Sequence, residues 1–237
     1  MSYNSGDRWT ARTAVPQVDI DVGLRQYMLR VYNYMAGGLA LTGLVAYFAA
    51  ASGFYQQIYG TPLYWVVLLA PLGMVLVLSF GIQRMSLGAA QLAFWVYAGL
   101  MGLSIAGIFI VYTQESIARV FFITAGTFAA MSIYGYTTRT DLSRFGSFLL
   151  MGLIGIILAS VVNIFIGSSA LQFAVSVIGV IVFVGLTAYD TQRIKEMYLE
   201  SDGAVVAGKK AIMGALALYL DFINLFMMLL QLFGRRN

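Results

Sequence analysis

The stretch "AIMGALALYLDFINLFMMLLQLF", residues 211–233, contains one charged residue, Asp221. A helix of about 20 apolar residues is long enough to cross the roughly 30 Å hydrocarbon core of a bilayer. A single strand or a loop of the same residues would leave its backbone N–H and C=O groups without partners in lipid. The stretch therefore predicts a membrane-spanning helix that carries a carboxyl group near its middle.

The composition of the whole chain agrees with a membrane protein. Of its 237 residues, 60% are hydrophobic and 10% are charged, whereas soluble domains carry about 25% charged residues. The chain contains neither Cys nor His. Disulfides and thiol nucleophiles are therefore excluded, and so are the commonest metal ligand and the commonest general base.

Further apolar runs precede the last one, and each is long enough to span a bilayer. They lie near residues 29–52, 63–83, 88–112, 119–138, 145–167 and 171–192. Short links between them predict antiparallel neighbours. The sequence lacks the alternation of apolar and polar residues that is typical of β-barrel strands. We expect an all-α membrane protein, a seven-transmembrane helix bundle over residues 27–237. Residues 1–26 are polar and predict a flexible cytoplasmic tail.

The basic residues predict how the helices are oriented. Eleven of the 14 Lys and Arg residues fall in the tail and in the links that follow the second, fourth and sixth runs. Basic residues accumulate on the cytoplasmic side of membrane proteins, so we expect a cytoplasmic N-terminus. Seven crossings then place the C-terminus outside. Arg235 and Arg236 oppose this bias, which leaves open a re-entrant last segment.

Ionisable side chains inside a membrane are costly and mark functional candidates. Asp221 is the clearest, because it shares a helical stripe of small and polar residues with Gly214, Ala217, Asn224 and Met228. Such a stripe predicts a face toward the protein interior or a wet cavity. The alternative is a buried carboxyl group that only holds helices together.

Two other charged residues lie near the ends of apolar runs. Asp190 stands in "GLTAYDTQRIK", residues 185–195, and Arg84 follows the second run. From the pattern alone, Asp190 could equally be an interfacial carboxylate, and Arg84 could be a simple topology anchor.

The pair "GLTAYDTQRIK" and "LALYLDFINLFMMLLQLFG", residues 216–234, resembles the Bax inhibitor-1 family, and the likeness extends over the chain from about residue 27. The resemblance implies a seven-helix fold with the C-terminal helix at its centre. It implies a pH-sensitive calcium leak channel, with Asp190 and Asp221 as the pH sensor and Arg84 as a latch. For a bacterial member we expect the inner membrane.

If the two aspartates meet, simple electrostatics predicts a switch. Two carboxylates in contact share a proton at acid pH, and at higher pH they repel each other or recruit Arg84. Together with carbonyls and water they would form a weak, transient calcium site that suits passage better than storage. Asn224 and Thr187 are further pore-lining candidates. We expect calcium ions, protons and the bilayer as partners, and no resident cofactor.

The sequence is also compatible with functions other than a channel. A proton-coupled transporter is the strongest alternative, followed by a regulatory protein that binds a membrane protease or another partner without transport. Intramembrane aspartyl proteases carry G-x-G-D in the second motif, whereas "LYL" precedes Asp221, so we do not expect an enzyme. A retinal protein needs a lysine in the last span, and residues 211–233 contain none. The dispersed basic residues do not favour nucleic-acid binding.

Overall fold

The computed structural model describes residues 17–237, with side chains from residue 22 onward. Over this range the secondary-structure elements are all helices: α1 (Gln17–Ala51), α2 (Phe54–Ile58), α3 (Pro62–Gly81), α4 (Leu87–Ile105), α5 (Ile108–Val111), α6 (Gln114–Thr137), α7 (Ser143–Ile166), α8 (Ser169–Glu196) and α9 (Ala204–Phe233). Seven helical segments are long and apolar enough to cross a membrane. The predicted seven-span all-α fold is confirmed.

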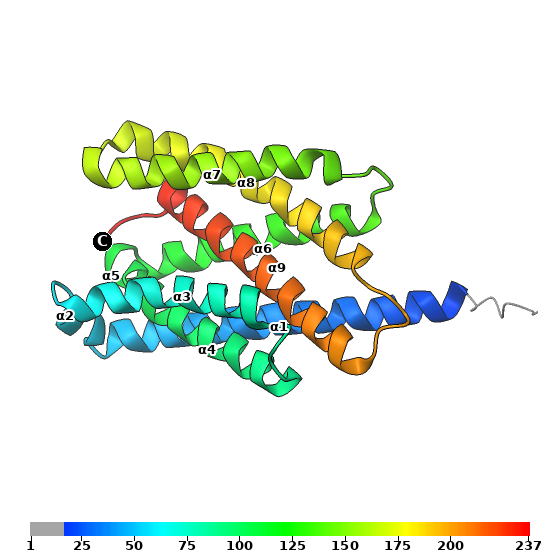
Figure 1. Ribbon diagram of the computed structural model, residues 1–237. Helices are drawn as coiled ribbons and strands as arrows, with labels where there is room; N and C mark the ends of the chain where they lie inside the picture. Colours follow the sequence, from blue (N-terminus) through cyan, green and yellow to red (C-terminus); the bar gives the residue numbers. More distant parts are fainter. Residues whose placement is uncertain (1–16) are drawn as a thin grey trace, which may run out of the picture.

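The two ends of the described chain lie at opposite ends of the bundle (Figure 1). The links after α6 and α8 lie at the end where α1 begins, and the link after α7 lies at the other end, near the C-terminus. With 30 residues, α9 is about 45 Å long. It therefore runs the length of the bundle and does not turn back.

The C-terminal residues are held at the end of the bundle that α9 reaches. The Thr113 N–H donates to the carbonyl of Arg235 at 3.0 Å, and the Arg235 N–H donates to the Ser116 hydroxyl at 2.8 Å. The Asn237 N–H bonds the carbonyl of Val111 at 3.0 Å. These bonds fix the last residues to the link between α5 and α6.

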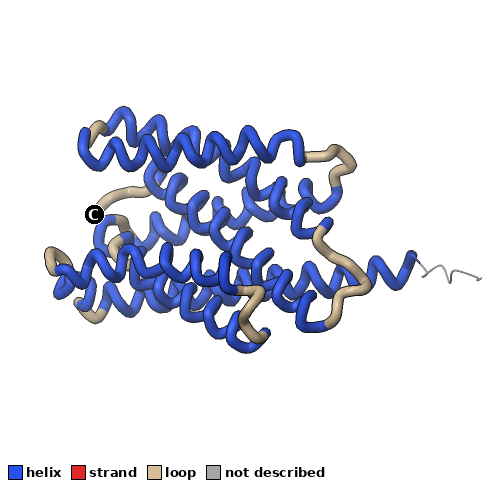
Figure 2. The backbone as a smooth tube through the Cα atoms, in the orientation of Figure 1, coloured by secondary structure: helices blue, strands red, loops and turns tan. Residues whose placement is uncertain are grey.

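Helix α9 is the centre of the bundle, as the family resemblance implied. In its apolar span 67% of residues are buried, compared with 11% for α3 and for α7. It packs against α8, α1, α6 and α4, and it crosses the middle of the tube view (Figure 2). Small residues permit this close packing. A Cβ added at Gly214 would lie 3.0 Å from Cγ2 of Ile194 on α8.

Several helix ends differ from the apolar runs. Helix α1 begins at Gln17, inside the stretch 1–26 that the sequence predicts to be a tail, while residues 1–16 lie outside the described part. Helix α8 continues to Glu196, and α9 begins at Ala204, seven residues before 211. Hydropathy marks where lipid ends, whereas a helix continues until its backbone hydrogen bonds find another partner.

The third apolar run is not one continuous helix. It is divided at Ala106 and Gly107 into α4 and the short α5. The aromatic ring of Tyr55 occupies the space beside the break, where a Cβ on Gly107 would lie 2.8 Å from the tyrosine hydroxyl. A larger residue at this position would require the Tyr55 ring to move.

Candidate functional site

The structure brings Asp190 of α8 and Asp221 of α9 together. Their carboxyl groups are close enough to share a hydrogen bond when one of them is protonated, and Asp221 is only 4% exposed. Such a bond requires a proton on one of the two groups, because an ionised carboxylate has no hydrogen to donate. The arrangement is therefore a two-carboxyl site that can hold one shared proton.

One oxygen of this pair lacks a hydrogen-bond donor. Among the described residues, none donates to the buried Oδ2 of Asp221 while both carboxyl groups are ionised. The nearby Asn224 does not supply one, because its side-chain amide donates to the carbonyl of Leu220 at 2.8 Å. A buried polar atom left without a partner costs about 1–3 kcal/mol, and more if it is charged. Such atoms are rare in folded proteins, and a bound water or ion or a functional role explains those that occur.

The pair lies on the wall of a cavity of about 750 Å³. Helices α7, α8 and α9 form most of the wall, with one residue from α3. Most of the lining is apolar, and the polar lining residues are Ser147, Ser160, Tyr189, Asp190, Arg193, Asp221 and Asn224. The volume lies within the range of about 300–1,000 Å³ that is typical of ligand pockets.

The stripe predicted on the last helix lies along this wall. Ala217, Asp221, Asn224 and Met228 all line the cavity, while Gly214, at one end of the stripe, packs against Ile194 of α8. The pattern of small and polar residues thus predicted a cavity-facing surface. What it could not show was that α8 forms the opposite wall.

The remaining residues of the predicted site lie elsewhere. Arg84 is exposed in the turn that follows α3, and it forms no ion pair with Asp190 or Asp221. Thr187 is fully buried and donates to the carbonyl of Phe183 on its own helix at 2.8 Å. It is not among the residues that line the cavity. The latch and pore-lining roles of these two residues stay predictions.

Arg193 is the cation that lines the same cavity as the aspartates. It lies three residues after Asp190, and residues three apart share one face of a helix. The spacing of Asp190 and Arg193 is visible in the sequence. The apolar run near 171–192 ends before Arg193, however, so hydropathy does not include this residue in the span. A positive charge beside two carboxyl groups offsets part of their charge and weakens the binding of a cation.

Other polar residues of "DTQRIK" hold α8 in place. The side-chain oxygen of Gln192 accepts from the N–H of Leu142 at 2.8 Å. The Lys195 ammonium donates to the carbonyl of Tyr136 at 2.9 Å, where a cation also complements the C-terminal end of the α6 dipole. These contacts fix the end of α8 to α6 and to the link 138–142, and Asp190 is turned toward α9.

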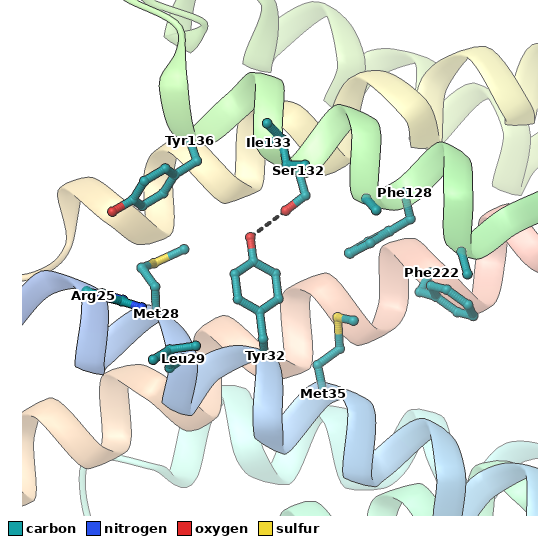
Figure 3. Close-up of a pocket in the computed structure, with 12 residues that line it drawn as sticks. Arg25, Met28, Leu29, Tyr32, Met35, Phe128, Ser132, Ile133, Tyr136 and Phe222 are labelled. Atoms are coloured by element: carbon teal, nitrogen blue, oxygen red, sulfur yellow. Dashed lines mark hydrogen bonds between the residues drawn. The ribbon is translucent and has the colours of Figure 1, made fainter.

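Thr191 begins a hydrogen-bonded chain that runs across three helices. Its hydroxyl bonds the hydroxyl of Ser132 on α6 at 3.0 Å, and Ser132 bonds the hydroxyl of Tyr32 on α1 (Figure 3). Thr191 also donates to the carbonyl of Thr187 at 2.7 Å. Sequence reasoning missed this chain, because single hydroxyls in separate helices carry no pattern.

Two carboxyl groups meet here. In the described part of the chain, no group of three or more Asp, Glu, His or Cys side chains could hold a metal ion. Calcium takes six to eight oxygen ligands when it is bound tightly. The site can therefore contribute two acidic ligands to a passing cation, and the other ligands must be neutral oxygens.

The chain was compared with known proteins. A family model described as inhibitor of apoptosis-promoting Bax1 matches residues 24–237. The inner membrane protein YbhL of Escherichia coli (strain K12) is 52% identical over 219 residues, which cover 91% of this chain and 94% of YbhL. The uncharacterized protein RP147 of Rickettsia prowazekii is 49% identical over 229 residues, covering 96% and 97% of the two chains.

Proposed function

The chain belongs to the Bax inhibitor-1 family of membrane proteins, and from this premise we propose that it is a calcium-permeable leak channel controlled by the protonation of Asp190 and Asp221. The observation that carries the proposal is the buried contact between these two carboxyl groups at the wall of a large cavity. The buried Oδ2 of Asp221, to which none of the described residues donates, provides an acceptor for a proton or a cation at the same place.

The proposed switch is the shared proton. While it is present, the hydrogen bond holds α8 and α9 together at this level. When it leaves, two negative charges face each other, and like charges about 4 Å apart repel by roughly 4 kcal/mol at an effective dielectric constant of about 20. Moving a two-state equilibrium from 1:99 to 99:1 takes about 5.5 kcal/mol. The repulsion is reduced by the charge of Arg193 in the same cavity, and the remainder favours a second helix arrangement.

Calcium is the proposed permeant ion, because the cavity presents oxygen ligands. The two aspartates provide the charge, and Asn224, Ser147 and Ser160 line the same wall with neutral oxygens. Passage requires binding that is favourable enough for entry and weak enough for release. Arg193 in the cavity favours weak binding, so the arrangement suits a leak better than a storage site.

We further propose that the protein lies in a bacterial inner membrane with a cytoplasmic N-terminus. The relative YbhL is named an inner membrane protein, and the basic residues concentrate in the tail and in the links on the same side. That distribution is the one expected for cytoplasmic segments. Asp190 then lies in the cytoplasmic half of α8.

The test is calcium flux into proteoliposomes across a pH series. We expect the wild-type flux to titrate, and we expect Asp190→Asn and Asp221→Asn to abolish that pH dependence. Glu200→Gln is the matched control, because it removes an exposed carboxylate in the 197–203 link. Wild-type flux that Asp221→Asn leaves unchanged at every pH would overturn the gating proposal, and no wild-type flux would overturn the channel itself.

The same assay tests the latch that the family resemblance implies. If Arg84 reaches the pair after deprotonation, Arg84→Gln should shift the titration of the flux. An unchanged titration would identify Arg84 as a topology anchor.

A proton-coupled transporter is the second candidate, and the shared proton is the observation that favours it. A carrier exchanges a fixed number of protons for each calcium ion, whereas a leak moves calcium down its gradient without such a ratio. Proton and calcium fluxes measured together in the same vesicles distinguish the two. A constant ratio over a range of calcium gradients would favour the transporter.

A further inference from the structure

A second hollow lies on another face of α9, between α1 and α6. Helix α1 packs on α4 and α9, and α6 packs on α8 and α9, so α9 lies between α1 and α6. The groove measures about 590 Å³ and includes Phe222 of α9 in its lining. Figure 3 shows the side chains that surround it.

The groove is polar at one end and apolar at the other. Arg25 and Tyr136 lie at one end, and Phe128, Met35 and Phe222 lie at the other (Figure 3). Arg25 precedes the first apolar run, which begins near residue 29, and Tyr136 is close to the end of the fourth span at Thr137. The polar end therefore lies at the level of the lipid headgroups, and the apolar end lies deeper in the bilayer.

The middle of the groove contains hydroxyl groups that already have partners. Tyr32 and Ser132 bond each other, and Ser132 also bonds Thr191. None of the buried unpaired side-chain atoms found in the described residues belongs to the groove lining. An apolar chain can therefore pass along the groove without leaving a polar group unsatisfied.

A third hollow, lined by other residues, shows what an ordinary lipid-facing surface looks like in this protein. It measures about 850 Å³, lies against α1, α2 and α4, and is lined by residues such as Leu44, Phe48 and Leu103. Its described lining carries no charged residue. Both grooves can accept an acyl chain, but only the groove between α1 and α6 places a cation at the headgroup level.

The charge of the groove between α1 and α6 selects the kind of lipid. Arg25 lines the groove, and none of the described lining residues is a carboxylate. The Lys195 ammonium lies nearby, 5.1 Å from the centre of the Tyr136 ring. A guanidinium group binds phosphate oxygens well, and basic pockets between membrane helices bind anionic headgroups.

We propose that the groove between α1 and α6 binds one anionic phospholipid, with its phosphate on Arg25 and an acyl chain along Met28, Leu29 and Ile133 toward Phe128. The lipid comes from the leaflet on the N-terminal side of the protein. This site is separate from the aspartate cavity, and it does not depend on the proposed calcium leak.

The first experiment measures headgroup selectivity with the purified full chain. The protein is equilibrated in micelles with equal amounts of dioleoyl phosphatidylglycerol and dioleoyl phosphatidylcholine, and bound lipid is counted by native mass spectrometry. We expect the wild type to retain phosphatidylglycerol about fivefold better, the preference that one basic residue near a membrane surface supports. Arg25→Gln should remove the preference. Arg30→Gln should keep it, because Arg30 is exposed on the same helix outside the groove.

The second experiment tests the location of the acyl chain. Ala129 lines the groove, and Ala130 beside it does not, although both are exposed. We expect Ala129→Trp to lower the retention of both lipids several-fold and Ala130→Trp to leave it unchanged. Equal retention of the two lipids by the wild type would overturn the proposal, as would an equal response to Ala129→Trp and Ala130→Trp. Thermal unfolding in the same micelles confirms that each variant is folded.

Discussion

Two hollows of opposite chemistry lie on two faces of the same central helix. Asp221 lines the cavity with the shared carboxyl pair, while the next residue, Phe222, lines the groove that carries Arg25. Helix α8 also has one face toward each hollow. Asp190 lines the cavity, and Thr191 bonds Ser132 in the groove. Neighbouring residues of a helix point about 100° apart, so one step along the chain separates the two environments.

The direction in which a side chain points around the helix axis decides its chemical environment here. Residues 221 and 222 lie at nearly the same depth in the bundle. Asp221 contacts a second carboxyl group, and Phe222 packs against Phe121 and Phe128, with ring centres 5.5 Å away in both cases. Hydropathy along the chain averages over both faces and cannot distinguish them.

The largest expected effect comes from measuring both calcium flux and lipid preference for one variant of each hollow. Asp221→Asn should abolish the pH dependence of calcium flux and leave the preference for phosphatidylglycerol intact, because the carboxyl pair is lost and Arg25 is untouched. Arg25→Gln should do the reverse. Flux and native mass spectrometry on both variants check this. If either variant removed both properties, the two hollows would be one functional site.

The next largest effect is expected where α6 touches α8. A Cβ on Gly135 would lie 2.2 Å from the carbonyl oxygen of Ala188, so Gly135→Ala must push the two helices apart. Overpacking of this kind costs about 1–3 kcal/mol, occasionally more. Unfolding in detergent measures the loss. Gly126→Ala on the same helix meets no atom within 4 Å and should be close to neutral, so equal losses would contradict the close packing.

A smaller effect is expected at the hydrogen-bonded chain. Thr191→Val keeps the shape of the side chain but removes the hydroxyl that bonds Ser132, at a cost of about 1 kcal/mol. Thr191→Ser retains the hydroxyl and should be milder. The free energy of unfolding and the pH profile of flux are measured together. The comparison of the two faces predicts that Thr191→Val changes stability and leaves the pH profile unchanged, and a shifted profile would show that the faces communicate.

The smallest effect is expected for a carboxylate outside the membrane. The N–H of Ser143 donates to Asp141 at 2.9 Å, and the backbone and hydroxyl of Ser143 hold the pKa of Asp141 below its ordinary value. A lowered pKa in the folded state means that this carboxylate stabilises the fold above its unfolded pKa of about 3.9, and that the contribution is lost as the pH falls through the folded value.

Asp141→Asn should therefore lower the midpoint of thermal unfolding slightly at pH 7, and the difference should disappear near the acid end of the titration. The effect is small because Asp141 is exposed to solvent. A difference that grew as the pH fell would contradict the sign of this prediction.

The seven helices could be predicted from the sequence because lipid leaves the backbone few choices. Every N–H and C=O group must be paired inside the bilayer, and a helix does this within one segment. The stripe of Ala217, Asp221, Asn224 and Met228 was also readable, since residues three or four apart share a helix face. It predicted a cavity-facing surface on the last helix, and the family resemblance placed that helix at the centre.

The family resemblance implied a shared role for Asp190 and Asp221, but the contacts across each face are decided by the tertiary structure. The contact of Asp190 with Asp221 depends on α8 continuing to Glu196 and on its rotation against α9. The groove with Arg25 depends on α9 lying between α1 and α6. Helices in a membrane associate through close packing of particular side chains, because lipid and the protein interior are similarly apolar. Hydropathy therefore predicts which segments cross the bilayer, and only packing decides which residues meet.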